Sequence, residues 1–268
     1  MSIEKKPLVN DLYTADPSAH VFNGKIYIYP SHDEDIDVEN NDNGDQYDMK
    51  DYHVYEMPDT ETYPRDCGCV LKLEDIPWAS KQLWAPDCVE KDGKYYFVFP
   101  ARDKEGFFRI GIATSDKPEG PFKAEPNYIP GSYSIDPCMF PDTDGKYYLT
   151  FGGIWGGQLD QYRNNKWSAD NKEPKGDEEA CTAKIALMKD NLLEMAEEPK
   201  DIVIVDENGK PLTGGDEARR YFEDPWMFKK GDTYYFTYST GTTHLLCYAT
   251  SKSVYGPFTY GGVILTPV

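Results

Sequence analysis

Carboxylic acids recur in this chain beside a proline and at the start of an expected strand. Asp16, Asp136 and Asp224 each precede a proline, Asp87 follows one, and Glu223 stands directly before Asp224. Several carboxyl groups around one pocket suit acid/base chemistry, because one must be ionised to activate water while another holds a proton for a leaving group. For Asp87 and Asp224, the alternative interpretation is an acid that only begins a strand and caps a turn.

The segments that carry these acids form a fourfold repeat. They read ADPSAHVFNGKIYIYPSHD from Ala15, WAPDCVEKDGKYYFVFPA from Trp84, SIDPCMFPDTDGKYYLTFGG from Ser134 and FEDPWMFKKGDTYYFTYSTG from Phe222. In each, a short apolar strand, a turn rich in Gly, Asp, Asn and Lys, and a strand of alternating Tyr and Phe predict a hairpin. Two similar segments, RIGIATSDKPEGPFK and LLCYATSKSVYGPFTY, follow the second and fourth hairpins and predict the outer strands of each unit.

Units of about four strands that recur along a chain are typical of a β-propeller, whose blades surround a central channel. If each hairpin begins with its innermost strand, the acids that head these strands converge at the channel mouth. We therefore expect an all-β fold, with residues 1–268 forming a single propeller domain that contributes four blades. Residues 184–188 are expected to form a strand by analogy with the other blades, although their surroundings are weakly helical in pattern.

Composition limits the partners and the compartment. The formal net charge of -19 repels nucleic acid and anionic membrane surfaces, so a neutral or cationic partner is expected. No apolar run approaches the ~18 residues of a membrane span, and the first residues lack the apolar core of a secretory signal, which favours a cytoplasmic protein. The six cysteines match no compact disulfide scaffold and are expected to be reduced.

Two segments between the repeats are expected to be loops. Residues 33–51 are strongly acidic and are interpreted as a solvated loop, with a contact at the pocket rim or a cation site as alternatives. Residues 156–180 form a polar insertion that is expected to be a wall over the pocket.

From Asp11 to Val268 the sequence resembles the family 43 glycoside hydrolases. The resemblance rests on the first repeat, on LWAPDCVEKDGKYYFVF in the second and on SIDPCMF in the third. It implies a five-bladed propeller that removes α-L-arabinofuranosyl or β-D-xylosyl groups from short plant-cell-wall oligosaccharides with inversion. It also implies that Asp16 is the general base, that Glu223 is the general acid, and that Asp136 orients the acid and tunes its pKa.

One departure from the family pattern bears on the acid. Members often have Glu-Gly or Glu-Ala where this chain has EDPW, so Glu223 and Asp224 compete for that role. Glu223 is favoured, because the offset of Asp224 from Pro225 repeats that of Asp16 from Pro17 and so indicates a structural position.

Sugar sites also need flat apolar faces and hydrogen-bond donors. Trp84 is the first stacking candidate, and Trp155, Gln158 and His53 are further substrate-binding candidates. The chemistry requires no cofactor. The family commonly carries calcium in the channel, held with a histidine of the last blade that this chain lacks, so the metal ligands are left unassigned. If the loops 33–51 and 156–180 wall the pocket into a dead end, the enzyme acts at chain ends.

Two other functions compete with this prediction. A non-catalytic sugar-binding propeller would use the same pocket without turnover. A retaining fructan- or sucrose-cleaving propeller would use the first-blade Asp as nucleophile, but such enzymes usually have Asn before that Asp and Cys after the acid Glu, where this chain has Ala15 and Asp224.

The resemblance calls for a fifth blade, and the repeats account for four. Blades bury their faces against both neighbours, so a missing blade would expose apolar surface at a cost on the order of 10 kcal/mol. We therefore expect the domain to be incomplete at its C-terminal end, with the fifth blade in further residues or in a companion chain. The first and fourth blades should then flank an open wedge.

Overall fold

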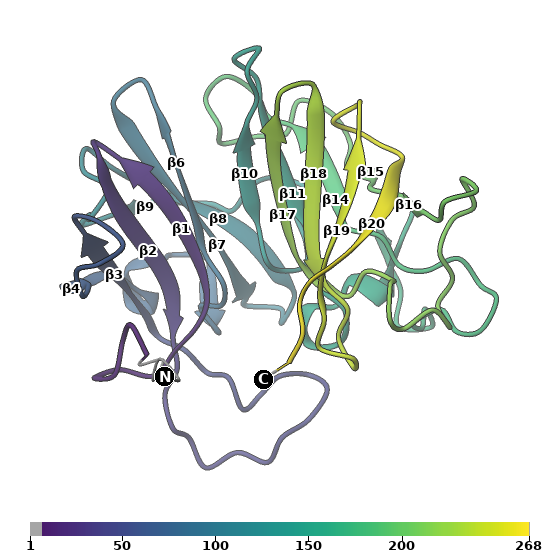
Figure 1. Cartoon of the computed structure of the whole chain (residues 1–268). Coiled ribbons are helices and arrows are strands. Elements are labelled where there is room, and N and C mark those ends of the chain that lie inside the picture. Colours follow the sequence, from purple (N-terminus) through teal and green to yellow (C-terminus); the bar gives the residue numbers. More distant parts are fainter. Residues whose placement is uncertain (1–6, 268) are drawn as a thin grey trace, which may run out of the picture.

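The computed structural model describes residues 7–267, which form strands, three short 3-10 helices and connecting loops. Four of its sheets are blades, antiparallel except for one short parallel pair in the fourth, that stand side by side around a central space (Figure 1). No helix among the described residues has the length and apolar character needed to cross a membrane.

The first two blades come from the first half of the chain. Blade 1 has the order β1 (Thr14–Phe22), β2 (Lys25–His32), β3 (Asp51–Met57) and β4 (Arg65–Lys72). Blade 2 contains β5 (Ala79–Lys81), β6 (Asp87–Lys91), β7 (Lys94–Asp103), β8 (Phe108–Ser115) and β9 (Lys123–Ala124). Both β5 and β6 pair with the long strand β7, and the 3-10 helix η1 (Leu73–Asp75) connects the blades.

The second half of the chain forms the other two blades. Blade 3 has the order β10 (Cys138–Pro141), β11 (Tyr147–Phe151), β14 (Lys184–Leu187) and β15 (Lys200–Asp201). Blade 4 has the order β17 (Glu223–Lys230), β18 (Thr233–Ser239), β19 (Leu246–Ser251) and β20 (Phe258–Leu265), with β16 (Ile204–Val205) parallel to β20. Between β11 and β14 lie η2 (Trp155–Gly157), η3 (Leu159–Gln161) and the small hairpin β12 (Tyr162–Arg163) and β13 (Lys166–Trp167).

The predicted hairpins form where the turn residues demand them. Asn23 and Gly24 have φ of 52° and 77°, and Asp92 and Gly93 have φ of 54° and 77°. Two consecutive residues in this left-handed region make the tight turn that matches the twist of paired strands. Alternation then buries every second side chain, as in β18. The prediction of a strand at residues 184–188 is also confirmed, since β14 covers Lys184–Leu187.

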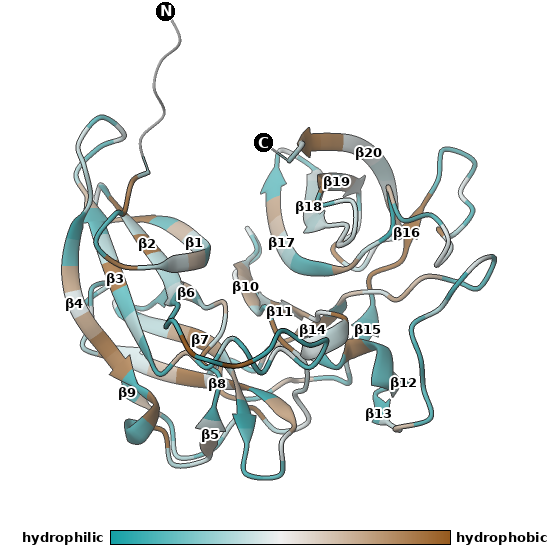
Figure 2. Cartoon of the chain, turned by 90° about the horizontal axis from the view of Figure 1, so that it is seen from below, coloured by the Kyte–Doolittle hydropathy of each residue, from teal (hydrophilic) through white to brown (hydrophobic). Residues whose placement is uncertain are grey.

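The core consists of two apolar clusters between the blades. One joins blade 1 to blade 2, and the other joins blades 2, 3 and 4. The innermost strands touch in the series β1, β6, β10 and β17. Viewed from below, the sheets of blades 1 and 4 stand apart at the remaining side (Figure 2). The predicted all-β propeller with four blades is therefore confirmed.

Candidate active site

The acids that head the inner strands share an unusual backbone conformation. Asp16, Asp136 and Asp224 have positive φ of 46°, 54° and 57°, and each precedes a proline. β1 carries a register shift between Ala15 and Ser18, and β17 carries one between Glu223 and Trp226. Asp is among the few residues that tolerate this backbone region, and β-bulges commonly re-aim side chains beside active sites. The repeat therefore turns these carboxyl groups toward the space between the blades.

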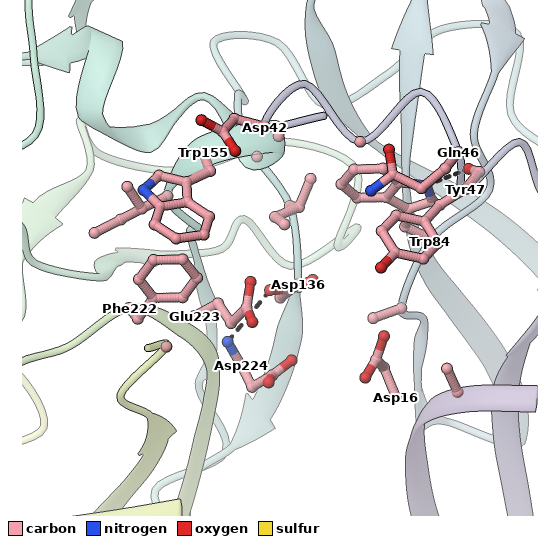
Figure 3. A pocket seen from close by; sticks show the side chains of 18 of the residues that line it. Asp16, Asp42, Gln46, Tyr47, Trp84, Asp136, Trp155, Phe222, Glu223 and Asp224 are labelled. Atoms are coloured by element: carbon pink, nitrogen blue, oxygen red, sulfur yellow. Dashed lines mark hydrogen bonds between the residues drawn. The ribbon is translucent and has the colours of Figure 1, made fainter. Parts of the chain in front are cut away.

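These acids meet at one cavity of about 820 Å³. Its lining includes Asp16 from blade 1, Asp136 at the head of blade 3, and Glu223 and Asp224 from blade 4. Figure 3 shows Glu223 and Asp136 together on one side of the cavity and Asp16 across from them. Six carboxylates line the cavity: Asp16, Asp33, Asp42, Asp136, Glu223 and Asp224. No Lys or Arg is among the lining residues.

Burial and mutual repulsion hold protons on this cluster. Burial, with the charges of Asp224 and Asp16, raises the pKa of Glu223 well above its usual value. Burial and the charge of Asp16 raise the pKa of Asp224 to about 7. The pKa of Asp136 is also raised well above its usual value, first by burial and then by the charges of Asp224, Glu223 and Asp16. Such a cluster keeps at least one carboxyl group protonated at neutral pH.

Asp16 differs from the other acids in its contact with solvent. Its side chain is exposed to the cavity, whereas Asp136 is only 8% exposed. Burial raises the pKa of Asp16, but water in the open cavity still hydrates its carboxylate. Asp136 instead accepts a hydrogen bond from the backbone N–H of Asp224 at 3.2 Å. Asp16 is thus the acid best placed to be ionised beside an attacking water.

Asp87, the fourth acid of the repeat, has a structural role. It is 1% exposed, its Oδ1 lies 2.6 Å from His20 Nε2, and its Oδ2 accepts the N–H of Met139 at 2.8 Å. His20 also lies against Trp226, with ring centroids 5.2 Å apart. Asp87 begins strand β6, as the alternative interpretation expected, but instead of capping a turn it links blades 1, 2 and 3.

Aromatic side chains form two walls above the acids. Trp84 lies on one side, where its Nε1–H donates to the carbonyl of Tyr47 at 2.7 Å, and Trp155 and Phe222 lie on the other (Figure 3). Trp155 is 43% exposed and packs edge-on against Phe222, with ring centroids 4.9 Å apart. Its Nε1–H donates to Glu173 Oε2 at 3.1 Å, which fixes the indole plane.

Residues 33–51 form a loop that is largely exposed to solvent, as expected, and that also makes the contact at the pocket rim that was the alternative. Asn40, Asn41, Asp42, Gly44, Gln46, Tyr47 and Met49 all line the cavity. The buried Arg102 donates to the backbone and side-chain oxygens of Asn43 at 2.7 and 2.9 Å and to Gln82 Oε1 at 2.5 Å. Gln82 in turn donates to the carbonyl of Gly44 at 2.7 Å. These contacts hold the loop against blade 2.

Gly44 shows how closely this loop approaches Trp84. Its φ is +72°, and a Cβ built there would lie 2.4 Å from Trp84 Cη2. A larger residue would therefore be strained in its backbone and would also collide with the indole ring.

Two predicted substrate contacts lie elsewhere. Gln158 is 9% exposed, accepts the N–H of Phe108 at 2.9 Å and donates to the carbonyl of Gly106 at 3.2 Å, so it is a packing residue outside the cavity lining. His53 lies on blade 1 beside Asp66, also outside that lining. Of the insertion 156–180, only Gly156 and Gly157 reach the cavity, and Glu173 acts through Trp155.

Several lining residues were not predicted. Tyr47, Gln46 and Phe222 had no chemical signature in the sequence, and His244 also lines the cavity. A buried arginine such as Arg102 also gives no sequence signal, because its role depends on carbonyl groups that only the fold brings together. The position of Phe222 directly before Glu223 was the one available sign that it could line the cavity.

Comparisons with known proteins agree with this geometry. Residues 5–266 match the family model described as glycosyl hydrolases family 43. A Bacteroides ovatus protein named xylosidase/arabinosidase is 58% identical over 269 residues, which cover 100% of this chain and 83% of the relative. The solved structure of RS223-Beta-xylosidase has a TM-score of 0.96 at 56% identity and covers 98% of this chain and 82% of its own.

A second solved structure contains a sugar. CoXyl43, a β-xylosidase/α-arabinofuranosidase from a compost microbial metagenome, was determined with xylotriose in a calcium-free form. It has a TM-score of 0.95 at 56% identity and covers 98% of this chain and 81% of its own. With the acids, the four blades and these matches in agreement, this chain belongs to glycosyl hydrolase family 43.

Proposed function

We propose that this glycoside hydrolase is an inverting, exo-acting enzyme that releases β-D-xylosyl and α-L-arabinofuranosyl residues from short oligosaccharides. The observation that carries the proposal is the meeting of Asp16, Asp136 and Glu223, from three different blades, at one cavity. The names of the relatives, xylosidase/arabinosidase and β-xylosidase, support the two sugars.

In the proposed reaction Asp16 removes a proton from water as the water oxygen bonds to the anomeric carbon. Glu223 gives its proton to the glycosidic oxygen as the bond from that oxygen to the anomeric carbon breaks. The product sugar then has the opposite anomeric configuration, and the two carboxyl groups of such enzymes lie about 6.5–9.5 Å apart to accommodate the water. The position of Asp16 across the cavity from Glu223 suits this arrangement (Figure 3).

Asp136 is proposed to hold the segment of the acid in place. It accepts the N–H of Asp224, the residue next to Glu223, at 3.2 Å. The pKa of Asp136 is itself raised, by burial and by the charges of Asp224, Glu223 and Asp16, which favours a protonated carboxyl group beside the acid. Glu223 is preferred to Asp224 as donor because its longer side chain reaches toward Asp136 and the aromatic walls, as Figure 3 shows.

The exo mode follows from the walls of the cavity. The loop 33–51 and the segment at Trp155 stand on opposite sides, and Trp84 and Trp155 offer apolar faces for the C–H surfaces of a sugar. If the enzyme instead cut within chains, the viscosity of polymeric xylan would fall with little release of monosaccharide.

Calcium in this channel is proposed as a structural ligand, and the chemistry above requires no cofactor. The donors fit the ion, because the cavity has several carboxylates and no cationic side chain among its lining residues, and Ca²⁺ binds oxygen ligands. Asp224 is one of these carboxylates, and the charge of a bound ion would offset the repulsion within the cluster. A rise in melting temperature with added Ca²⁺ that is lost in D224N tests this proposal.

We also propose that the protein works in the cytoplasm. Its six cysteines are free, and Cys88, Cys138 and Cys247 are buried as thiols, which suits a reducing compartment. Fractionation of the native cell with an antibody to the chain tests the location.

The experiment that tests the function is a panel of nitrophenyl glycosides followed by NMR of the first anomer released. We expect hydrolysis of the β-D-xyloside and the α-L-arabinofuranoside with inversion. Retention would favour the fructan-type mechanism. Calorimetric binding of xylo-oligosaccharides without turnover would favour the sugar-binding propeller.

A further inference from the structure

Two of the four histidines of the chain meet on blade 1, outside the cavity. His32 is the last residue of β2, Asp51 is the first residue of β3, and His53 follows on β3. One ligand atom from each of the three lies within 4.8 Å of the others. The imidazole rings of His32 and His53 are 5.3 Å apart at their centroids.

The cluster is open to solvent yet well ordered by its neighbours. The side chains of His32, Asp51 and His53 are 18%, 25% and 16% exposed. They lie on the opposite face of blade 1 from Tyr52 and Val54, which are fully buried. A small ion can therefore reach the cluster without opening the core.

Asp66 orients His53 in the way that carboxylates orient metal-binding histidines. His53 Nδ1 lies 3.0 Å from Asp66 Oδ2, so His53 is oriented by one ring nitrogen and its other nitrogen is free to bind. Metal-binding histidines usually donate their second N–H to a carboxylate in this way. Asp66 itself is anchored, since its Oδ1 accepts the N–H of Gly68 at 2.7 Å.

We propose that His32, Asp51 and His53 form a zinc site. Two imidazoles and one carboxylate suit Zn²⁺, whereas Ca²⁺ and Mg²⁺ prefer sites in which every ligand is an oxygen atom. Two Zn²⁺ bonds of about 2.0–2.2 Å span at most about 4.4 Å, so atoms within 4.8 Å need only small side-chain movements to share one ion.

The position of the site gives it a role. His32 directly precedes the acidic loop and Asp51 ends it, so the bound ion would join both ends of the segment that walls the cavity. Two side-chain contacts already join the ends, His32 Nδ1 to Asp51 Oδ1 at 2.6 Å and the solvent-exposed ion pair of Lys50 Nζ with Glu34 Oε2 at 2.8 Å. Zinc is therefore expected to restrain the loop and to slow its cleavage by a protease.

The test is equilibrium dialysis of the whole chain against Zn²⁺ in the presence of excess Ca²⁺, which occupies carboxylate-only sites. We expect one equivalent of Zn²⁺, loss of that equivalent in H53Q and in H32Q, and binding weakened by about tenfold or more in D66N. H244Q is the matched control, because His244 lies at the cavity and should leave zinc binding unchanged. Protection of residues 33–51 from proteolysis by Zn²⁺ should disappear in H53Q.

Cysteine is the competing ligand, because Cys69 pairs with His53 in the strand register. Co²⁺ as a probe separates the two: the proposal expects visible d–d bands without a thiolate charge-transfer band, and C69S should bind as the original chain does. Zinc binding that survives in both H53Q and H32Q, or that is lost only in C69S, overturns the proposal. Unchanged glycoside hydrolysis and circular dichroism in H53Q establish that the variant is folded.

Discussion

The carboxyl groups of this site depend on a backbone conformation that few residues accept. Asp16, Asp136 and Asp224 are all left-handed, at the same place in three blades. Each proline that follows disfavours the right-handed helical region for the residue before it and so limits the alternatives. The chain thus places short acids at left-handed positions, two of them beside register shifts, where most other side chains would be strained. The pattern is visible in the sequence as Asp-Pro, although the conformation is not.

Replacing the proposed acid separates its role from that of the base. E223Q should lower kcat/KM for 4-nitrophenyl β-D-xyloside by about 10²–10⁴-fold, because general acid catalysis contributes about that much. With a 2,4-dinitrophenyl leaving group the loss should be much smaller, since that group departs without a proton. D16N should lower both rates by similar factors, because attack by water is needed in each case.

D224N is the matched variant for this experiment. If Glu223 is the donor, D224N keeps the ordinary dependence on the leaving group and shifts the basic limb of the pH–rate profile to lower pH. The direction follows because the charge of Asp224 raises the pKa of Glu223. A loss confined to poor leaving groups in D224N, and absent in E223Q, would assign the acid to Asp224.

The raised pKa of Asp224 predicts how the stability of the fold depends on pH. Its pKa rises on folding from 3.8 to about 7, so the folded state binds this proton more tightly than the unfolded state. The free energy of unfolding should therefore fall as pH rises from about 4 to about 7. D224N should remove part of this fall and be more stable than the original chain at pH 8, by up to a few kcal/mol at about 1.4 kcal/mol per pKa unit.

Urea unfolding at pH 4 and pH 8 measures this difference. D232N is the control, because Asp232 is exposed on the turn between β17 and β18, away from the cavity. Equal stability of D224N and the original chain at both pH values would contradict the predicted burial of charge.

At the scale of elements, the hairpins were readable from sequence and the loops were not. Turn residues and alternating aromatics determine a hairpin through local geometry, so the four repeats were placed correctly. The loop 33–51 is held by contacts from residues far along the chain, such as Arg102 to Asn43. The sequence also placed His53 and Gln158 at the substrate, and the structure does not. A polar residue near a repeat gives no sign of which face of the sheet it occupies.

Arg102 is expected to control the shape of the cavity through that loop. R102M removes the hydrogen bonds to Asn43, Gln82 and Gly106 and leaves the buried Gln82 Oε1 without this donor. Bonds to charged groups contribute about 1.5–3 kcal/mol each, so we expect a loss of about 3 kcal/mol or more in stability and a raised KM for xylobiose. Urea unfolding and steady-state kinetics measure the two effects.

K81M is the control for this variant. Lys81 also contacts the loop, at Asp45 Oδ1, but its side chain is 40% exposed. Exposed ion pairs contribute about 0–1 kcal/mol, so K81M should change both stability and KM little. Equal effects of R102M and K81M would show that the buried guanidinium does not support the wall.

At the scale of the molecule, the two outer faces of blades 1 and 4 remain uncovered. Val21 on β1 is 69% exposed, and Phe228, Val263 and Leu265 on blade 4 are 40%, 44% and 59% exposed. Phe228 stacks on Tyr235 at 4.9 Å with an interplanar angle of 4°, as part of this outer face. The opposite face of blade 4, with Phe236 and Tyr238, is fully buried in the shared core.

This asymmetry supports the expectation that a fifth blade, from further residues or a companion chain, covers blades 1 and 4. Exposed apolar side chains that gather on one face can mark an interface. The sequence indicated the gap between blades 1 and 4 through the repeat count.

Substitutions on the two faces of blade 4 test whether its outer face is free in the 268-residue chain. In that chain F228S should leave the free energy of unfolding nearly unchanged, lower the fluorescence of bound 1-anilinonaphthalene-8-sulfonate and increase the fraction of monomer, because Phe228 packs only against its own blade. F236S, on the covered face, should cost about 3–5 kcal/mol, as expected for a large core side chain. If F228S destabilises the chain as much as F236S does, the outer face of blade 4 is already packed and no further blade is needed to cover it.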